Sequence, residues 1–201
     1  MPIKKHQKHI IFCDFISSCI LDFDNDLLLE EVSKIHSDTG FTSGARSGVN
    51  SWQSTQIRTG INDDGSFKLL EELKSEVMGY ASQVLSEFNI NKRCTRVDAW
   101  WINVNERHSY NTIHNHGRSD LIATYYVKAP ENSGNFVIQR NDGSSYSGLY
   151  NRSGISEFEE LRGCPVEKGL LIILPGHVWH YVRENNQSDS RISISYNLTV
   201  S

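Results

Sequence analysis

The segment Arg191-Ile192-Ser193-Ile194-Ser195-Tyr196-Asn197-Leu198-Thr199 alternates between polar and apolar side chains. Successive side chains of a β-strand point to opposite faces, so this period of two predicts a strand with one buried face. Arg191 stands on the same face as the serines. We therefore expect the face that carries Arg191 and the serines to look into a polar pocket.

From Cys94 onward the sequence contains further short strand-like segments. They are separated by clusters of Gly, Asn, Ser and Pro, at intervals typical of an all-β sandwich or barrel. Together with the segment above, taken as 190–199, they lie at residues 95–104, 121–128, 135–140, 168–174 and 178–183. The stretch from Arg140 to Arg162 is rich in Gly and Ser, and we expect it to be a long loop over one end of the sandwich.

The first half of the chain is mainly helical in pattern. We expect a short strand at 9–15, a helix from Asn25 that ends before Gly40, a polar loop at 42–65 and a second helix over about 66–88. The order predicts an α+β fold that is mainly β, with N-terminal helices packed against the sandwich. We expect one domain over 1–201, with the strand, loop and helices in 1–93 and the β core with its site in 94–201.

Composition narrows the classes of partner. The net charge of −4 gives no general attraction to nucleic acid or to anionic membranes, and no run approaches the roughly 20 apolar residues of a membrane span. The four cysteines are dispersed, without a Cys-x-x-Cys pair, which is typical of free thiols in a reducing compartment. We expect a soluble cytoplasmic protein.

Three histidines form the strongest candidate site. His114 and His116 are spaced i, i+2, so on an extended backbone they point to one face, and His180 follows the apolar run 169–175. Three imidazoles can hold zinc with one open position or a redox-active iron with several. His36 and His108, like His177, lack this context, and we expect ordinary surface or packing roles for them.

The identity of the third ligand is open to one alternative. The common non-haem iron site has two histidines and a carboxylate, whereas His116 occupies the middle position here. Asp120 is the nearest carboxylate, but it lies four residues beyond His116, too far along an extended segment to share the paired geometry. We therefore rank His116 above Asp120.

Arg191 lies eleven residues after His180, in the alternating strand. Iron(II) chemistry with O₂ needs two further electrons, usually supplied by a 2-oxo acid whose far carboxylate is held by an arginine. A guanidinium fits that carboxylate as a planar fork. The alternative for Arg191 is a surface arginine on an edge strand.

At these residues the chain resembles the 2-oxoglutarate- and iron(II)-dependent oxygenases, and more closely a small family of bacterial and phage members. The resemblance extends from about residue 40 to the C-terminus. It is carried by 47–54 (with Trp52), Trp101-Ile102-Asn103, His114-Asn115-His116, Tyr125-Tyr126-Val127, Ser133-Gly134-Asn135-Phe136, the run from Lys168-Gly169 through Leu174-Pro175 to His180-Tyr181-Val182, and 191–197. The combination is far more specific than any one motif.

The resemblance implies a double-stranded β-helix, or jelly roll, with Fe(II) at its mouth and 2-oxoglutarate and O₂ as co-substrates. It also implies hydroxylation of a primary substrate, with release of succinate and CO₂, and no catalytic residue beyond the metal ligands. The implied roles are metal binding for His114, His116 and His180; co-substrate binding for Arg191, Tyr126, Asn103 and Ser193; and a candidate substrate pocket at Trp101 and Trp52.

Two other functions are also compatible with a metal site formed by the three histidines. A non-catalytic jelly-roll or cupin-like module would hold a structural metal, and a cupin-like enzyme would act without an oxo acid. Arg191 discriminates between these and the oxygenase, because neither needs a carboxylate anchor. The primary substrate and the oligomeric state are left open by the sequence.

Overall fold

The computed structural model describes residues 14–37, 47–58, 67–139 and 161–201. Within these ranges the chain forms two antiparallel sheets and two helices. The larger sheet has the order β1 (Ser17–Ile20), β10 (Leu170–Pro175), β7 (Leu121–Lys128), β12 (Arg191–Val200), β5 (Cys94–Asn105) and β3 (Trp52–Gln53), with β4 (Ile57–Arg58) also on β5. The smaller sheet has the order β2 (Gly48–Val49), β6 (Tyr110–His114), β11 (His180–Val182), β8 (Phe136–Gln139) and β9 (Leu161–Cys164).

The two faces of β12 are as different as its sequence predicts. Ile194 and Tyr196, with their apolar neighbours, lie in the core on the helical side of the large sheet. Ser193 and Asn197 lie on the opposite face, which is turned toward the small sheet. A second, smaller core joins the sheets there, with Ile172 and Phe136 among its members. The alternation therefore separates an apolar core from a partly polar space between the sheets.

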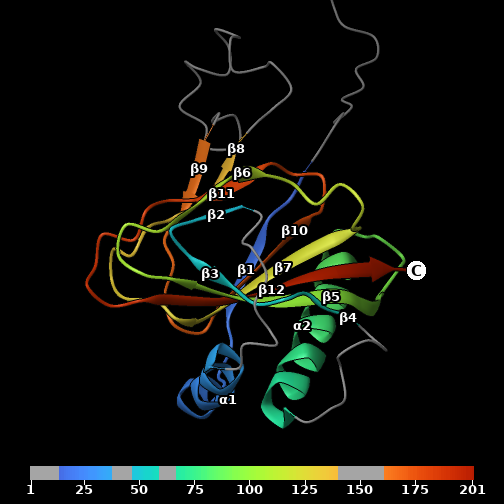
Figure 1. The fold of residues 1–201 in the computed structure, drawn as a ribbon. Helices are drawn as coiled ribbons and strands as arrows, with labels where there is room; N and C mark the ends of the chain where they lie inside the picture. The colour runs from blue at the N-terminus through green and yellow to red at the C-terminus, as the bar shows by residue number, and fades with distance from the viewer. Residues whose placement is uncertain (1–13, 38–46, 59–66, 140–160) are drawn as a thin grey trace, which may run out of the picture.

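Helices α1 (Asn25–Ser37) and α2 (Lys68–Glu87) lie side by side on the outer face of the large sheet, away from the small sheet (Figure 1). Each buries one apolar stripe, which in α2 includes Leu73 and Val77. The N-cap residue of α2, Phe67, has no side-chain cap. The Glu31 carboxylate of α1 instead accepts hydrogen bonds from the Leu69 and Leu70 N–H groups, at 3.2 and 3.1 Å.

Several expectations need correction at the level of elements. The N-terminal strand begins at Ser17, whereas residues 14 and 15 of the expected 9–15 strand are not in a strand and residues 9–13 lie outside the described residues. Strands β2, β3 and β4 all occur within 42–65, the stretch expected to be a polar loop. Strand β6 was not expected, and β9 begins at Leu161, inside the expected loop, of which 140–160 lie outside the described residues.

The first 93 residues contribute strands to both sheets. β1 pairs with β10, β3 and β4 pair with β5, and β2 pairs with β6. This interleaving positions the short strands beside the residues that carry the candidate site. None of the helices described is both long and apolar enough to cross a membrane.

Candidate metal site and its polar pocket

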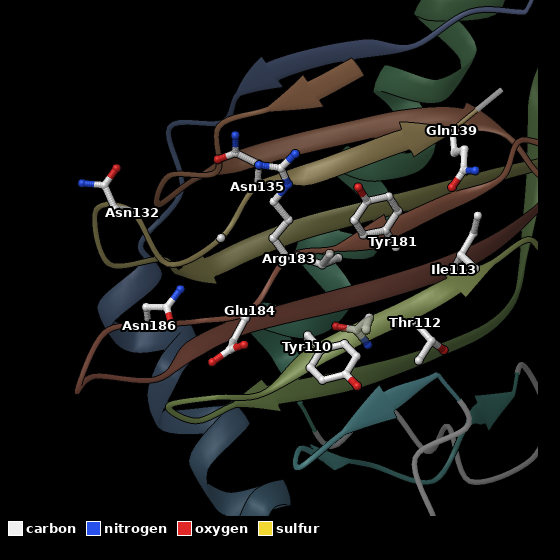
Figure 2. Close-up of a pocket in the computed structure, with 13 residues that line it drawn as sticks. Tyr110, Thr112, Ile113, Asn132, Asn135, Gln139, Tyr181, Arg183, Glu184 and Asn186 are labelled. Carbon is white, nitrogen blue, oxygen red and sulfur yellow. The ribbon is translucent and has the colours of Figure 1, made fainter. Parts of the chain in front are cut away.

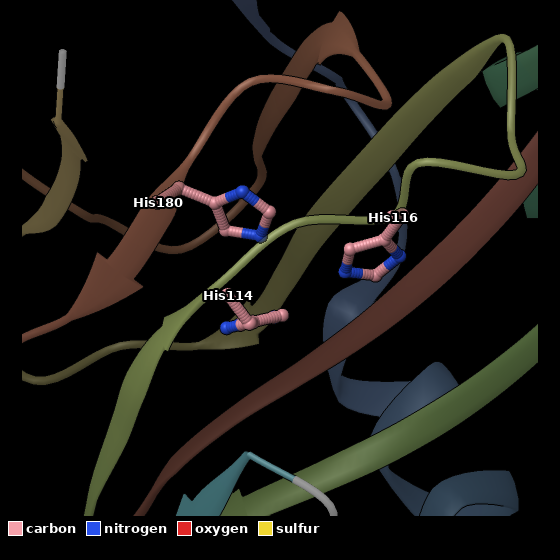
Figure 3. A group of neighbouring side chains, drawn as sticks. All are labelled: His114, His116 and His180. Atoms are coloured by element: carbon pink, nitrogen blue, oxygen red, sulfur yellow. The ribbon is translucent and has the colours of Figure 1, made fainter. Parts of the chain in front are cut away.

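Three histidines from separate parts of the sequence converge between the sheets (Figure 3). His114 ends β6, His116 follows it after one residue, and His180 begins β11. One ring nitrogen from each lies within 4.8 Å of those of the other two. The ring centroids are 4.4 to 5.3 Å apart. His114 and His180 are also direct partners across the β6–β11 ladder, so strand pairing itself brings these two side chains together.

Each imidazole has an oxygen acceptor near its Nδ1. The Thr112 carbonyl lies 2.7 Å from Nδ1 of His114, the Val178 carbonyl 3.0 Å from that of His180, and the Asn197 amide oxygen 2.7 Å from that of His116. An Nδ1–H donated to such an oxygen leaves the lone pair on Nε2. The three rings are thus held in the tautomer that presents Nε2 for metal binding.

Burial keeps the three imidazoles neutral. Desolvation lowers the pKa of His114, lowers that of His116 to about 4 and lowers that of His180 to about 3, and the hydrogen bonds at Nδ1 only partly oppose it. A neutral imidazole is the form that binds a metal ion. At neutral pH the cluster is therefore ready to ligate without losing protons first.

Two aromatic side chains flank the cluster. The Trp101 indole stacks on His116 with ring centroids 5.6 Å apart and an interplanar angle of 16°. Phe136 stacks on His180 with centroids 5.2 Å apart, also at 16°. Trp100 faces the other way, into the core beneath the helices. Trp101 is thus the tryptophan of this pair that lies at the candidate site.

Asp120 does not join the three histidines. Its carboxylate accepts a hydrogen bond from the Val200 N–H at 2.8 Å, at the end of β12. The group of possible ligand atoms in the described chain contains His116 and not Asp120. The other described histidines are engaged elsewhere: His108 contacts Glu184, His177 contacts Asp14, and His36 packs against Trp52.

Arg191 is almost completely buried, with 1% of its surface exposed. Its Nη1 donates to the backbone carbonyls of Ser133, of Gly134 at 3.4 Å and of Arg183 at 3.1 Å. Its Nη2 is also buried and has no hydrogen-bond partner among the described residues. The surroundings therefore fix the guanidinium through one nitrogen and leave the other available to a ligand.

Tyr126, like Arg191, has a buried hydrogen-bond donor without a partner in the described part of the chain. Its hydroxyl is buried without a partner among the described residues, and it interacts electrostatically with Arg191. Burial raises the pKa of this phenol, which therefore stays protonated and can donate. Buried polar atoms without partners are costly in a folded protein. A carboxylate would satisfy both donors at once, so the residues present fit an anionic ligand of that kind.

A row of buried polar residues runs across the inner face of the large sheet beside this pair. Strand register places Gln53 opposite Asn103, Asn103 opposite Ser193, and Ser193 opposite Tyr126. The Asn103 amide nitrogen lies 3.5 Å from the Ser193 hydroxyl and 3.1 Å from that of Ser195. The sequence-derived pocket residues Asn103, Ser193 and Tyr126 therefore do lie together.

Trp52 lies on the wrong face for the expected substrate pocket. It pairs with Val104 of the outer face, and its ring stands 4.4 Å from that of His36 on α1. Its neighbour Gln53 points inward and is buried. Sequence reasoning missed Gln53, because a two-residue strand has no periodicity to show which of its side chains faces the site. Only the register with Asn103 reveals it.

A separate groove of about 1070 Å³ lies on the outward side of the small sheet (Figure 2). Tyr110, Ile113, Tyr181 and Arg183 are among its lining residues. Tyr181 follows His180 in β11 and points to the opposite face of the sheet, as successive strand residues do. The groove and the histidine cluster are therefore separated by the backbone of the small sheet.

Comparison with known families and structures gives a consistent match. Residues 99–197 match the family described as "Putative 2OG-Fe(II) oxygenase". This range contains the three histidines, Arg191 and Tyr126. No curated protein matches the chain.

Three solved structures illustrate the likeness in fold. A Pseudomonas putida prolyl-4-hydroxylase has a TM-score of 0.63 and 13% identity, over 92% of this chain and 91% of that one. The 2-oxoglutarate-dependent epimerase SnoN from nogalamycin biosynthesis has 0.63 and 12%, over 93% and 77%. HygX from Streptomyces hygroscopicus, with nickel and 2-oxoglutarate bound, has 0.56 and 12%, over 92% and 82%.

These neighbours have the jelly-roll fold, which the two facing sheets of this chain also form. The family match and the fold cover the same strands that assemble the histidines and the polar pocket. Over residues 99–197, and in its fold, this chain is thus similar to the 2-oxoglutarate- and iron(II)-dependent oxygenases.

Proposed function

We propose that the protein is a 2-oxoglutarate- and iron(II)-dependent hydroxylase. The observation that carries the proposal is the pairing of two features between the sheets. Three neutral imidazoles each bring one ring nitrogen within 4.8 Å of those of the other two, and two buried donors, on Arg191 and Tyr126, lack partners among the described residues. A structural metal site would account for the first feature but not for the second.

In this proposal His114, His116 and His180 hold Fe(II) through Nε2. Bound iron with 2-oxoglutarate supplies the activation of O₂, with one oxygen atom going to succinate, which forms with CO₂, and the other to the substrate. The protein holds the imidazoles neutral by burial and oriented by their Nδ1 contacts. With three protein ligands, the metal keeps positions for the oxo acid and for O₂.

The far carboxylate of 2-oxoglutarate would bind Arg191 and Tyr126. Three backbone carbonyls hold Arg191 in place, so little side-chain freedom is lost on binding. Ser193 and Asn103 lie in the adjacent polar row and would contact the chain of the oxo acid. We add Gln53, whose side chain faces the same space, and Trp101, which forms the wall beside His116.

The three-histidine site differs in charge from one with two histidines and a carboxylate. Three neutral ligands leave the full charge of the metal ion to be balanced by the oxo acid and by whatever else binds there. This difference strengthens attraction for an anionic co-substrate. Hydroxylation is the outcome we propose, and the neighbouring 2-oxoglutarate-dependent epimerase shows that the same fold also supports reactions other than hydroxylation.

We place this activity in the cytoplasm. Cys94 is a buried thiol whose pKa is raised by desolvation, an arrangement that persists in a reducing compartment. The proposed small-molecule partners are 2-oxoglutarate and O₂. The net charge of −4 argues against nucleic acid as the primary substrate.

The test is turnover of 2-oxoglutarate to succinate by the iron-loaded protein, in the presence of candidate substrate pools. We expect turnover that requires Fe(II), is lost in His180→Ala, and in Arg191→Ala needs roughly 10- to 100-fold more 2-oxoglutarate, the equivalent of a lost charged hydrogen bond. Arg191→Lys is the matched control, because it keeps the charge without the fork and should recover only part of the affinity. Unchanged consumption in both alanine variants would refute the proposal.

A further inference from the structure

The three imidazoles are oriented in two different ways. His114 and His180 each contact the backbone carbonyl of the residue two positions earlier, Thr112 and Val178. These acceptors belong to the same local segments as the histidines, and no side-chain substitution removes them. The acceptor for His116 is instead the side chain of Asn197, 81 residues away on β12 of the opposite sheet.

His116 needs this outside support because of its place in the chain. It lies beyond the last residue of β6, where its backbone is held by hydrogen bonds to Gly176 and from Ser119. The Trp101 indole, stacked on the imidazole, restrains the plane of the ring. A stacked ring can still flip about its Cβ–Cγ bond. The flip returns the ring to the same plane with its nitrogen and carbon positions exchanged. A directional hydrogen bond is what distinguishes the two orientations.

The chemistry of the amide then determines the tautomer. If the Asn197 oxygen accepts from Nδ1–H, Nε2 of His116 carries a lone pair toward the other two histidines. If the amide nitrogen donated to Nδ1 instead, the proton would sit on Nε2 and point into the cluster. Only the first arrangement can bind a metal ion through Nε2, and it is the one in the structure, where Oδ1 lies 2.7 Å from Nδ1.

We propose that Asn197 is a positioning residue for the metal site, which holds His116 in the Nε2-ligating tautomer and orientation. The inference rests on the proposed function, since it assumes that the histidines bind the metal. Asn197 lies on the same face of β12 as Arg191 and Ser193, so one strand positions both a metal ligand and the co-substrate anchor. The large sheet thereby controls a ligand that the small sheet alone leaves without an acceptor.

The experiment compares Asn197→Ala, Asn197→Asp and Thr199→Ala. Aspartate keeps an acceptor for Nδ1–H, whereas alanine removes it. Thr199 is the matched control, because its hydroxyl lies 2.5 Å from the Asp98 carboxylate, farther along the same strand and away from the histidines. Two quantities are measured: Co(II) affinity by competition with a chelator, and the His116 tautomer in metal-free protein by ¹⁵N chemical shifts of the imidazoles.

We expect Asn197→Ala to bind Co(II) roughly 10- to 100-fold more weakly than wild type, the range for a lost outer hydrogen bond to a metal ligand. Its His116 should show a mixture of tautomers. Asn197→Asp should restore wild-type affinity or exceed it, and Thr199→Ala should match wild type. Wild-type Co(II) affinity with an unchanged tautomer in Asn197→Ala would overturn the inference.

Two outcomes separate this inference from the proposed function. If wild-type protein binds no Co(II), the metal site itself is refuted, while the ¹⁵N shifts still decide whether Asn197 sets the tautomer. If Asn197→Ala unfolds, the folded Asn197→Asp and Asn197→Ser variants decide the matter. The serine side chain is too short to reach His116. The inference is supported if Asn197→Asp retains Co(II) affinity and Asn197→Ser loses it, and it is contradicted if both variants lose affinity equally.

Discussion

At the scale of single residues, the site combines groups that are satisfied with groups that are not. Arg191 uses Nη1 fully and leaves Nη2 without a partner in the described structure, and the Tyr126 hydroxyl is in the same condition. Leaving such atoms unpaired destabilises the ligand-free protein. This cost is expected of a binding site, where the missing acceptor arrives with the ligand.

Replacing Tyr126 by phenylalanine should separate stability from binding. Because the hydroxyl has no partner in the described structure, Tyr126→Phe should leave the free energy of unfolding of the ligand-free protein unchanged or slightly increased. Loss of a hydrogen bond to a carboxylate should weaken 2-oxoglutarate binding about tenfold. Denaturant unfolding and calorimetric titration check the two halves. A clear destabilisation with unchanged 2-oxoglutarate affinity would show that the hydroxyl has a structural partner instead.

The buried histidines should also make the metal-free protein acid-sensitive. In the folded state, burial lowers the pKa of His116 to about 4 and that of His180 to about 3, while unfolding returns both to about 6.5. Below pH 6.5 the unfolded chain therefore binds protons that the folded chain does not. The free energy of unfolding should fall as pH drops from about 6.5 toward 4, and this contribution should be fully present above 6.5.

The measurement is urea unfolding of metal-free protein between pH 7.5 and pH 5. The double variant His116→Gln/His180→Gln serves as the reference, because all other titrating groups are common to both proteins. The stability difference between wild type and variant should shrink or reverse toward pH 5. A difference independent of pH would mean that these imidazoles titrate alike in both states.

At the scale of elements, the alternation in 191–199 identified β12 and the orientation of its two faces, because a strand between two different environments needs a period of two. The helical stripe around Val77 likewise predicted α2. Strand β6 could not be found this way. A register irregularity in its pairing with β11 breaks the alternation, and Tyr110, Thr112 and Ile113 are partly or largely exposed.

The short strands escaped prediction for a related reason. Trp52–Gln53 is too short for any periodicity, so the sequence drew attention to the large aromatic residue, whereas the pairing with β5 turns Gln53 inward. The three histidines could be singled out from their residue type and spacing, and Arg191 from its place in the alternating segment 191–199. The Asn197 contact was not, since it joins two sheets whose relative position the sequence does not show.

Helix α2 depends on a cap from another helix. The Glu31 carboxylate accepts from two N–H groups at its first turn, where a negative charge also interacts favourably with the helix dipole. Glu31→Ala should therefore lower the free energy of unfolding by about 1 kcal/mol. Glu30→Ala, at the exposed neighbouring position, is the control and should stay within about 0.5 kcal/mol of wild type. Equal effects in thermal unfolding would show that the cap contributes nothing beyond helix propensity.

At the scale of the whole molecule, the two sheets have separate tasks. The small sheet supplies His114 and His180, and the large sheet supplies Arg191, Tyr126 and the acceptor for His116. The helices bury the outer face of the large sheet and leave its inner face to the polar pocket. The proposed function therefore depends on the packing of one sheet against the other, because it places the metal and the oxo acid between them.

The most direct test is an anaerobic titration of the Fe(II)-loaded protein with 2-oxoglutarate, followed by visible absorption. If the oxo acid chelates iron held by the three histidines while Arg191 and Tyr126 bind its far carboxylate, a metal-to-ligand charge-transfer band should grow and saturate in wild type. The same band should need far more 2-oxoglutarate in Arg191→Ala and be absent in His180→Ala. Iron that binds to wild type without any such band would contradict an oxygenase and indicate a closed structural metal site.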